Sequence, residues 1–564
     1  MKIGIGLLAL SLTLTLATTA RAQSQNQTLN NALKVKLHQE IDYVGDLYGS
    51  VYAPKSWKET HLKWDLPAQV TLAHAKIAAA QNMREARQAL GDLISSTADY
   101  HVSYRFYSTE KATLPFYVKT VEGKSLIVSI DRTKLSETAF PFQEGDEILT
   151  MDQMPIAQAK GQLILQMGAN IAATDNSLAD LMLTRRNGRS NALVPQGFVN
   201  LSIKRAEDDT VGTVTLTWDY TPEQLSQQNL APFRLQRPKH SLFHHMTGAK
   251  VWALEDDESD ENPYDLGSRN SFLPDFGDRI WETTEDNTFD AYIYQNAEGR
   301  LIGVVRIFGY ETEDYDQAVK DFSGIIEHMQ KHTSALVIDQ NNNPGGSVFY
   351  LYALASMLSD QALAVPKHSI ALTGGEASEC VAITEKLAKV ENDDDAAEAL
   401  KDEDMDGYPA TYQVALGVRD YCKVVLEEYQ SGKAFSTPYC LWGVDKITPN
   451  AIHYTKPIVL LVNELDFSGG DFFPAILQDN KRVTIVGTRT AGAGGYINQV
   501  KFPNNFGLEF LTFTGSIAER VDQNPIENLG VTPEVKLGFT VEDIRDGFQR
   551  YQDGVRTVIK GLVR

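Results

Sequence analysis

The sequence predicts a mixed α/β domain with smaller units attached to it. Three observations lead to this prediction. Strand and helix patterns alternate from residue 299 onward, apolar residues recur at helical spacing over residues 30–96, and short runs with alternating apolar residues fill residues 101–219. With 564 residues, 43% hydrophobic and 22% charged, the chain has the composition of a folded protein and enough length for several hydrophobic cores.

The N-terminus has the pattern of a secretory signal. Lys2 precedes an apolar run over residues 3–16, and Ala20-Arg21-Ala22 forms a small-residue cleavage site before Gln23. This run is too short for a stable membrane anchor, and no later segment approaches the ~18 uninterrupted apolar residues of a membrane span. We therefore expect a protein that is exported to the periplasm or beyond and has no membrane span.

The patterns divide the chain into five parts. After the signal, helical spacing gives way to alternating short strands and then to a polar stretch that contains the acidic run EDDESDE. Alternating strands and helices follow, with one acid-rich helical insertion. The predicted boundaries are residues 1–22 for the signal peptide, 23–100 for a helical region, 101–220 for a β-rich unit, 221–296 for an acidic linker, and 297–564 for the α/β core with a helical insertion at 380–432.

Within the α/β core, apolar runs of four to six residues predict strands and longer periodic stretches predict helices. The expected strands are residues 302–307, 335–339, 458–462 and 483–486, and the expected helices are residues 317–329, 350–358 and 471–478.

Charge and cysteine content exclude several classes of protein. The net charge of −22 argues against nucleic acid or an anionic membrane surface as the main partner. Cys380, Cys422 and Cys440 are too few for a disulfide framework. Either one pair forms a bridge in an oxidising compartment, or all three thiols stay unpaired.

No motif predicts a cofactor or a metal. The phosphate-binding GxxxxGK[ST] and the dinucleotide-binding GxGxxG motifs are missing from the chain after the signal. Residues 402–407 match the first half of a calcium loop, but Gln413 stands where the bidentate glutamate is required. His328 and His332 are spaced like zinc ligands, but Met329 replaces the glutamate of a zincin, and a solvated helix face is the simpler interpretation.

A candidate nucleophile lies between a strand and a helix. Ser468 follows the predicted strand 458–462 at a turn, and Gly469 and Gly470 come directly after it. A helix N-terminus supplies positive potential there, and the Gly469 N–H could face a developing oxyanion. The turn differs from the GxSxG elbow because Asp466 occupies the first glycine position. The alternative is that Ser468 only caps the helix.

A second candidate stretch follows the predicted strand 335–339. It ends in Pro344-Gly345-Gly346, and two successive glycines can turn their N–H groups into one concavity that suits an anion. The alternative is an ordinary tight loop.

Together these stretches resemble the tail-specific, or C-terminal-processing, serine peptidases. The resemblance rests on NNPGG, on DFSGG and on VGTRTAGAGG, and it covers roughly residues 300–360 and 440–537. Residues 142–156 also resemble the PDZ-like segment of that family. The resemblance implies a crotonase-like α/β core with an N-terminal helical region and an inserted PDZ-like β-rich domain.

The catalytic base of the common family members is missing. Those members use a lysine in a TxGKG stretch, and here Ala493 holds that position, while Lys501 lies outside the motif. His101, in the sequence DYHV, is similar to an element of those members that use histidine, and Glu527, in IENLGV, is similar to their late carboxylate.

This resemblance implies a Ser–His–Glu set in which Ser468 attacks the peptide carbonyl, His101 carries the proton, and Glu527 orients His101. The N–H groups expected to form the oxyanion hole are those of Gly345, Gly346 and Gly469.

The main hypothesis is therefore a secreted serine endopeptidase that acts on protein or peptide substrates. The resemblance further implies a zymogen that removes part of the 221–296 segment by cutting itself between about residues 240 and 290, and then acts as a homodimer. The alternatives are a catalytically inactive homologue that binds peptides or partner proteins, and an esterase on the same fold.

Overall fold

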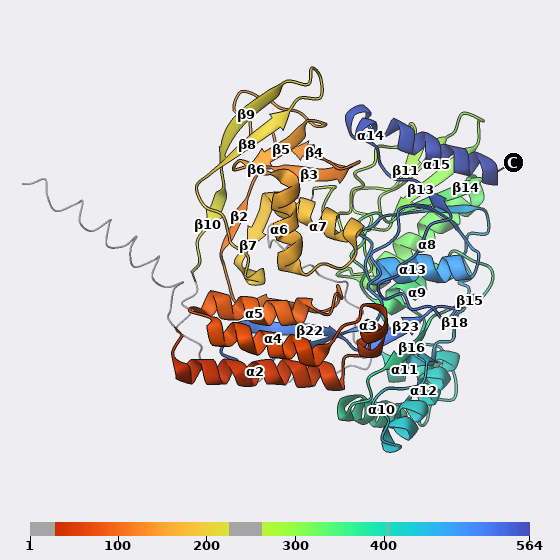
Figure 1. Cartoon of the computed structure of the whole chain (residues 1–564). Helices are drawn as coiled ribbons and strands as arrows, with labels where there is room; N and C mark the ends of the chain where they lie inside the picture. Colours follow the sequence, from red (N-terminus) through yellow and green to blue (C-terminus); the bar gives the residue numbers. More distant parts are fainter. Residues whose placement is uncertain (1–28, 225–261, 402, 404, 564) are drawn as a thin grey trace, which may run out of the picture.

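The computed structural model describes residues 29–224, 262–401, 403 and 405–563 (Figure 1). The predicted signal peptide and the acidic run EDDESDE lie outside the described residues. Within the described ranges, no helix is long and apolar enough to cross a bilayer.

Four helices form the N-terminal region: α2 (Asn31–Ser50), α3 (Lys55–His61), α4 (Leu66–Ala79) and α5 (Met83–Ser95). Asn30, Asp65 and Asn82 start three of these helices, because each side chain accepts a hydrogen bond from a backbone N–H three residues on. The apolar faces of α2, α4 and α5 pack against the late strand β22 (Leu508–Thr514), whose side chains belong to the same core cluster. The N-terminal region is thus built onto the C-terminal part of the chain (Figure 1).

The strand β1 (Ser103–Phe106) joins the two ends of the chain. It pairs antiparallel with β22, which also pairs with β21 (Ile497–Val500). The segment that contains His101 therefore leads directly from the last N-terminal helix into a sheet that the C-terminal half of the chain completes.

The β-rich unit has a sheet of six strands with two helices against it. The path of the sheet is β3-β4-β5-β8-β9, and β6 pairs with β5. The elements are β3 (Phe116–Val121), β4 (Lys124–Ile130), β5 (Glu147–Met151), β6 (Met154–Pro155), β8 (Phe198–Lys204), β9 (Val211–Thr217), α6 (Ile156–Met167) and α7 (Ala172–Thr184). A separate small sheet contains β2 (Lys111–Thr113), β7 (Arg185–Asn187) and β10 (Asp219–Thr221), and η1 (Gly188–Ser190) follows β7.

A sheet of seven strands forms the centre of the α/β core, in the order β11-β12-β13-β14-β19-β20-β24. Its last five strands are mutually parallel, while β11 and β12 are antiparallel at one edge. The strands are β11 (Trp281–Glu282), β12 (Ala291–Gln295), β13 (Leu301–Arg306), β14 (Ala335–Asp339), β19 (Ile458–Val462), β20 (Thr484–Gly487) and β24 (Val535–Lys536).

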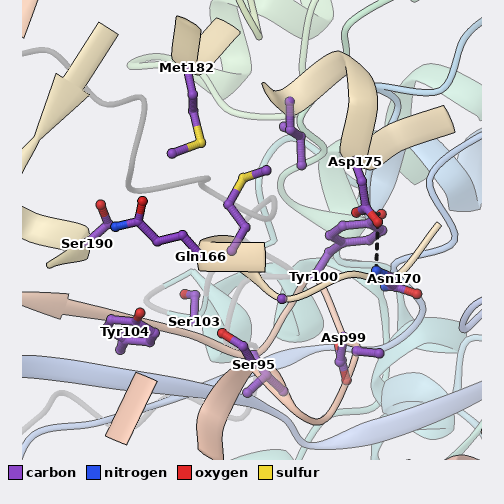
Figure 2. A pocket seen from close by; sticks show the side chains of 15 residues that line it. Ser95, Asp99, Tyr100, Ser103, Tyr104, Gln166, Asn170, Asp175, Met182 and Ser190 are labelled. Atoms are coloured by element: carbon purple, nitrogen blue, oxygen red, sulfur yellow. Dashed lines mark hydrogen bonds between the residues drawn. The ribbon is translucent and has the colours of Figure 1, made fainter. Parts of the chain in front are cut away.

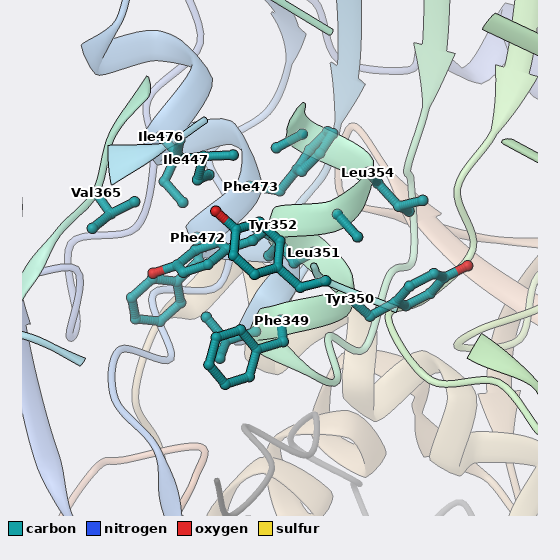
Figure 3. Packing of buried hydrophobic residues seen from close by; sticks show 14 of the residues in the cluster. Phe349, Tyr350, Leu351, Tyr352, Leu354, Val365, Ile447, Phe472, Phe473 and Ile476 are labelled. Atoms are coloured by element: carbon teal, nitrogen blue, oxygen red, sulfur yellow. The ribbon is translucent and has the colours of Figure 1, made fainter. Parts of the chain in front are cut away.

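Helices and loops cover both faces of this sheet, so the central strands β14 and β19 are buried at every position. One face packs against α8 (Tyr315–His332), α9 (Val348–Ser356) and α13 (Gly469–Asp479), and the other against α14 (Val541–Asp546) and α15 (Gln549–Leu562). Figure 3 shows how α9 is surrounded by apolar side chains, among them Phe472, Phe473 and Ile476 of α13. The tight contact between α9 and α13 fixes the loops that precede both helices.

The predicted strands 335–339 and 458–462 coincide with β14 and β19, and the predicted helix 317–329 is longer in the structure because Asp314 caps it two residues earlier than expected. The acid-rich insertion consists of α10 (Gly374–Leu387), α11 (Asp393–Leu400) and α12 (Tyr412–Gln430). Short strands flank it: β15 (Leu363–Ala364), β16 (Lys367–Ile370), β17 (Tyr439–Cys440), β18 (Lys446–Ile447) and β23 (Ser516–Glu519), with η2 (Leu441–Gly443). Cys380, Cys422 and Cys440 are buried free thiols in this region.

Candidate active site

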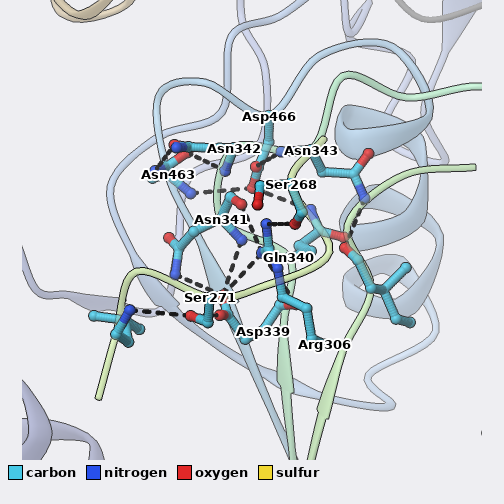
Figure 4. Close-up of polar contacts among 12 residues, drawn as sticks. Ser268, Ser271, Arg306, Asp339, Gln340, Asn341, Asn342, Asn343, Asn463 and Asp466 are labelled. Atoms are coloured by element: carbon cyan, nitrogen blue, oxygen red, sulfur yellow. Dashed lines mark hydrogen bonds and ion pairs between the residues drawn. The ribbon is translucent and has the colours of Figure 1, made fainter. Parts of the chain in front are cut away.

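Two loops meet at the carboxyl edge of the central sheet. β14 and β19 are parallel neighbours, so the residues that follow Asp339 and Val462 leave the sheet side by side. Asn342 and Asn463 tie these loops together through two hydrogen bonds, from Asn463 Nδ2 to Asn342 Oδ1 (2.8 Å) and from the Asn342 N–H to Asn463 Oδ1 (3.1 Å) (Figure 4). The NNPGG loop and the serine turn therefore form one unit.

Asp466 lies at the centre of this polar cluster and explains why the turn lacks the first glycine of GxSxG. Its carboxylate accepts hydrogen bonds from the Asn343 N–H (3.0 Å), the Asn463 N–H (3.0 Å) and Gln340 Nε2 (3.1 Å). Burial raises the pKa of Asp466 well above its usual range, and these donors oppose that rise. The side chain is a structural link between the two loops.

Ser468 has a strained backbone and a free hydroxyl. Its φ of 54° and ψ of −113° lie in a region that non-glycine residues rarely adopt, and such strain costs about 1–3 kcal/mol. The Asp471 N–H, which a capping serine would engage with its side chain, donates instead to the Ser468 carbonyl oxygen (2.8 Å). Ser468 Oγ has no hydrogen-bond partner in the described part of the chain. This geometry favours a nucleophile over a simple helix cap.

Asp471, in the first turn of α13, holds a third loop against the serine turn. Its carboxylate accepts hydrogen bonds from the N–H groups of Ser468 (3.0 Å), Gly492 (2.8 Å) and Ala493 (2.9 Å) and from the Thr490 hydroxyl. Burial raises the pKa of Asp471 to about 7, although these four donors oppose the rise. Ala493, the position of the family lysine, is thus fixed beside Ser468.

The two glycines of NPGG have conformations and surroundings that exclude a side chain. A Cβ on Gly346 would lie 2.2 Å from the Tyr310 carbonyl, and one on Gly345 would lie 2.7 Å from the Gly469 nitrogen. The Gly345 N–H already donates to Asn343 Oδ1 (2.8 Å), so it is not available to an oxyanion in this conformation. Among the described residues, the N–H groups of Gly346 and Gly469 donate to no other group, and a Cβ on Gly469 would lie 3.2 Å from the Gly346 nitrogen.

His101 lies in a turn that a carboxylate stabilises. Asp99 accepts hydrogen bonds from the His101 N–H, the Tyr52 hydroxyl and the Thr514 hydroxyl, each at 2.8 Å. Both ring nitrogens of His101 lack a hydrogen-bond partner in the described part of the chain. Burial lowers the pKa of His101 to about 4, and the Asp99 carboxylate opposes this change.

Tyr100 brings the His101 turn into contact with the serine turn. Its ring packs edge-on against Phe467, the residue before Ser468, with 5.4 Å between the ring centroids. The three predicted catalytic residues are all deeply buried, with exposed fractions of 0% for Ser468 and Glu527 and 1% for His101. No hydrogen bond joins the serine hydroxyl, the His101 ring and the Glu527 carboxylate in this conformation.

Glu527 is instead shared between a backbone N–H and a lysine. One carboxylate oxygen accepts the Gly494 N–H (2.9 Å), and the other forms a buried ion pair with Lys58 of α3. Burial and the Asp99 carboxylate raise the pKa of Glu527, and the Lys58 ammonium opposes them. Sequence reasoning missed Lys58, because a lysine in a short polar helix has the pattern of a solvated residue.

A cavity of about 120 Å³ lies next to the His101 turn (Figure 2). Val102, Met167, Leu178 and Met182 give it an apolar wall. Its polar wall includes Asp175, whose carboxylate accepts a hydrogen bond from the Tyr100 hydroxyl (2.8 Å). The cavity is therefore formed jointly by the His101 segment and by α6 and α7 of the β-rich unit.

Comparison with known proteins agrees with this fold and site. The model of peptidase family S41 matches residues 301–537, and that of the PDZ domain matches residues 110–225. An uncharacterized protein of Chlamydia muridarum is 36% identical over 94% of this chain and 93% of its own length. A protein of Chlamydia pneumoniae is 34% identical over 93% of this chain and 90% of its own length.

The chain therefore belongs to peptidase family S41 and is a serine peptidase that carries a PDZ domain. The predicted fold class, a crotonase-like α/β core with an N-terminal helical region and an inserted PDZ-like domain, is confirmed. Among solved structures, the chain is similar to mature CPAF, the Chlamydia protease-like activity factor, with a TM-score of 0.83 and 35% identity over 94% of this chain and 98% of the other. It is equally similar to mature CPAF complexed with lactacystin, with a TM-score of 0.82 and 34% identity over 94% of this chain and 99% of the other.

Proposed function

We propose that this chain is the precursor of an exported serine endopeptidase that uses Ser468, His101 and Glu527. The observation that carries the proposal is the serine turn itself. Ser468 is held in a strained conformation at the start of α13. Within the described residues, its hydroxyl makes no hydrogen bond, and the Gly346 and Gly469 N–H groups next to it have no acceptor. This combination supports nucleophilic attack and stabilisation of an oxyanion.

The proposed reaction has two halves. Ser468 Oγ attacks the peptide carbonyl carbon while neutral His101 takes the hydroxyl proton, and the Gly346 and Gly469 N–H groups donate to the oxyanion. His101 then protonates the leaving amine, and the acyl-enzyme forms. Water attacks the acyl-enzyme with His101 again as the base, which releases the new carboxyl end and restores Ser468. Glu527 orients His101 throughout.

Activation must precede this reaction, because the three groups are buried and not hydrogen-bonded to one another. We propose self-cleavage within the segment that sequence analysis gave as residues 240–290. Phe272, Leu273 and Phe276 of that segment are buried in the core, so the sites we propose come before residue 262, outside the described residues. We further propose that the cleaved enzyme acts as a homodimer on protein or peptide substrates.

The test compares purified wild type with Ser468→Ala. We expect wild type to cut itself and a denatured protein substrate, and the alanine variant to lose about 10⁴-fold or more in rate while it keeps its fold, since Ser468 Oγ supports no hydrogen bond. Gel analysis follows chain integrity, and light scattering before and after cleavage measures the oligomeric state.

Ala493 favours one other function, that of an inactive homologue that binds peptides or partner proteins, because the family lysine is absent. If neither protein cuts any substrate under conditions where both are folded, that second function replaces the first. Cleavage of ester substrates alone would indicate an esterase.

A further inference from the structure

Lys58 is a fully buried cation between the elements of the proposed active site. Its side chain, from α3, has an exposed fraction of 0%. Nζ donates to the Ala98 carbonyl oxygen (2.7 Å), to Asn528 Oδ1 (2.8 Å) and to Glu527 Oε1. Three acceptors use all three N–H bonds of an ammonium group.

This hydrogen bonding excludes Lys58 as the missing base. A general base needs a free lone pair, and a nitrogen that donates three hydrogen bonds has none. Lys58 nevertheless lies close to the position of the family lysine, since the Glu527 carboxylate that it contacts also accepts the Gly494 N–H, next to Ala493. A lysine from α3, far away in the sequence, therefore places its ammonium group near the position of the family lysine. Because all its N–H bonds are donated, Lys58 can influence the reaction only through the groups that it contacts.

Two strained turns face each other across Lys58. Ala98 and Asn528 both have positive φ values, 46° and 61°. The Ala98 carbonyl oxygen accepts from Lys58 Nζ and also from Asn528 Nδ2 (2.9 Å), and Asn528 Oδ1 accepts from Lys58. Because the segment from Ala98 leads directly to His101, these bonds fix the distance between the His101 turn and the loop of Glu527.

The charge balance of the site also depends on Lys58. Asp99 and Glu527 are two buried carboxyl groups that repel each other. The other titratable groups that act on them are Lys58, the His101 ring and the hydroxyls of Tyr48 and Tyr52. Lys58 favours the ionised form of Glu527 by its charge and its hydrogen bond, and the Gly494 N–H favours it by a hydrogen bond. Its removal would favour protonation of Glu527, and a protonated carboxyl group orients an imidazole less well.

We propose that Lys58 is a positioning residue of the active site, which holds the His101 turn and the Glu527 carboxylate at a fixed spacing and favours the ionised form of Glu527. This inference rests on the proposed Ser–His–Glu function.

Two substitutions separate the charge of Lys58 from its hydrogen bonds. Lys58→Met removes both, whereas Lys58→Gln can still donate to Ala98 and Asn528 but carries no charge. Lys160→Met is the matched control, because Lys160 forms an equally buried ion pair with Asp180 inside the PDZ domain, with exposed fractions of 4% and 3%. Thermal unfolding establishes that each variant is folded, and kcat, KM and their pH profiles are then measured with a peptide substrate.

We expect Lys58→Met to lower kcat at least 100-fold at pH 7 with KM within threefold of wild type. Lys58→Gln should lose less, with the acidic limb of its kcat profile moved at least one pH unit upward. Lys160→Met should lower the melting temperature and leave the pH profile unchanged. In a Glu527→Gln background, Lys58→Met should lower kcat further by less than threefold, because both changes affect the same step.

The outcomes distinguish this inference from the function on which it rests. If wild type does not cut substrate, the proposed function fails. If wild type is active and folded Lys58→Gln has its kcat and pH profile, the Lys58 inference is overturned alone. If Lys58→Met does not fold, the result for Lys58→Gln decides. If Lys58→Gln loses kcat but the acidic limb of its kcat profile does not shift, the role assigned to the charge of Lys58 is overturned.

Discussion

Glu464 allows a quantitative test of how the PDZ domain is fixed to the catalytic turn. It lies four residues before Ser468, and its carboxylate lies between the two domains, with 12% of the side chain exposed. It accepts hydrogen bonds from the Ser177 hydroxyl of α7 (2.7 Å) and the Thr488 hydroxyl (2.7 Å) and pairs with Lys119 of β3 (3.3 Å). Burial acts to raise the pKa of Glu464, but Lys119 and the two hydroxyls outweigh it and lower the pKa to about 2.

The magnitude follows from this pKa. An unfolded glutamate titrates near 4.5, so the ionised form contributes about 3 kcal/mol to the free energy of unfolding at pH 7. A group with a lowered pKa stabilises the fold above its unfolded pKa, and the contribution is lost as pH falls through the folded pKa. At pH 3 about 1.5 kcal/mol remains. Glu464→Gln should therefore cost about 3 kcal/mol at pH 7 and roughly half of that at pH 3.

The assay is urea unfolding followed by tryptophan fluorescence, with both proteins in a Ser468→Ala background so that self-cleavage does not interfere. Glu327→Gln serves as the control, because Glu327 pairs with Lys331 on the exposed face of α8 and should show no measurable change. A cost for Glu464→Gln below about 1 kcal/mol at pH 7, or a cost that does not change with pH, would refute the reasoning.

Two further predictions concern the site itself. Gly346→Ala would place a Cβ 2.2 Å from the Tyr310 carbonyl, so we expect about 1–3 kcal/mol of destabilisation and a 10²–10³-fold loss of kcat. The control Gly324→Ala, inside α8, adds a Cβ that meets nothing within 4 Å, so it should leave kcat unchanged and stabilise the fold by about 0.5–1 kcal/mol. Wild-type kcat in Gly346→Ala would contradict the oxyanion assignment. His101 has a pKa of about 4 against 6.5 in the unfolded chain, so only the unfolded chain binds its proton between these values and the fold loses stability as pH falls from 6.5. From pH 7.5 to 4.5 the free energy of unfolding should fall by about 2.5 kcal/mol because of His101. Denaturant unfolding of His101→Gln in the Ser468→Ala background should no longer show this fall. If the pH dependence is unchanged in that variant, His101 is not buried as a neutral side chain.

The central sheet and its two loops could be predicted from local patterns. The apolar runs 335–339 and 458–462 are short, continuous and followed by turn residues, which is the pattern of parallel strands covered on both faces. The carboxyl ends of such strands share one edge, and in the structure NNPGG and the turn of Ser468 meet there. For these two strands and the loops that follow them, the structure agrees with the local sequence pattern.

The hydrogen-bonding roles of other residues in the site could not be predicted from the sequence around them. Asp466 and Asp471 look like ordinary turn and cap residues in the sequence, yet each links two or more loops through its carboxylate. The engagement of the Gly345 N–H by Asn343 was also unexpected, since a glycine pair in a sequence does not show where its N–H groups point.

The sequence by itself thus determined the α/β core, the PDZ-like unit, the serine turn and the histidine that could replace the family lysine, because each depends on residues that are neighbours along the chain. The tertiary structure alone decided that Lys58 pairs with Glu527, 469 positions later, and that the ring nitrogens of His101 are buried without a hydrogen-bond partner among the described residues. The pairing of β1 with β22 and the hydrogen bonds from Lys58 to Ala98, Glu527 and Asn528 join opposite ends of the chain, and no spacing within the sequence encodes a contact between segments so far apart.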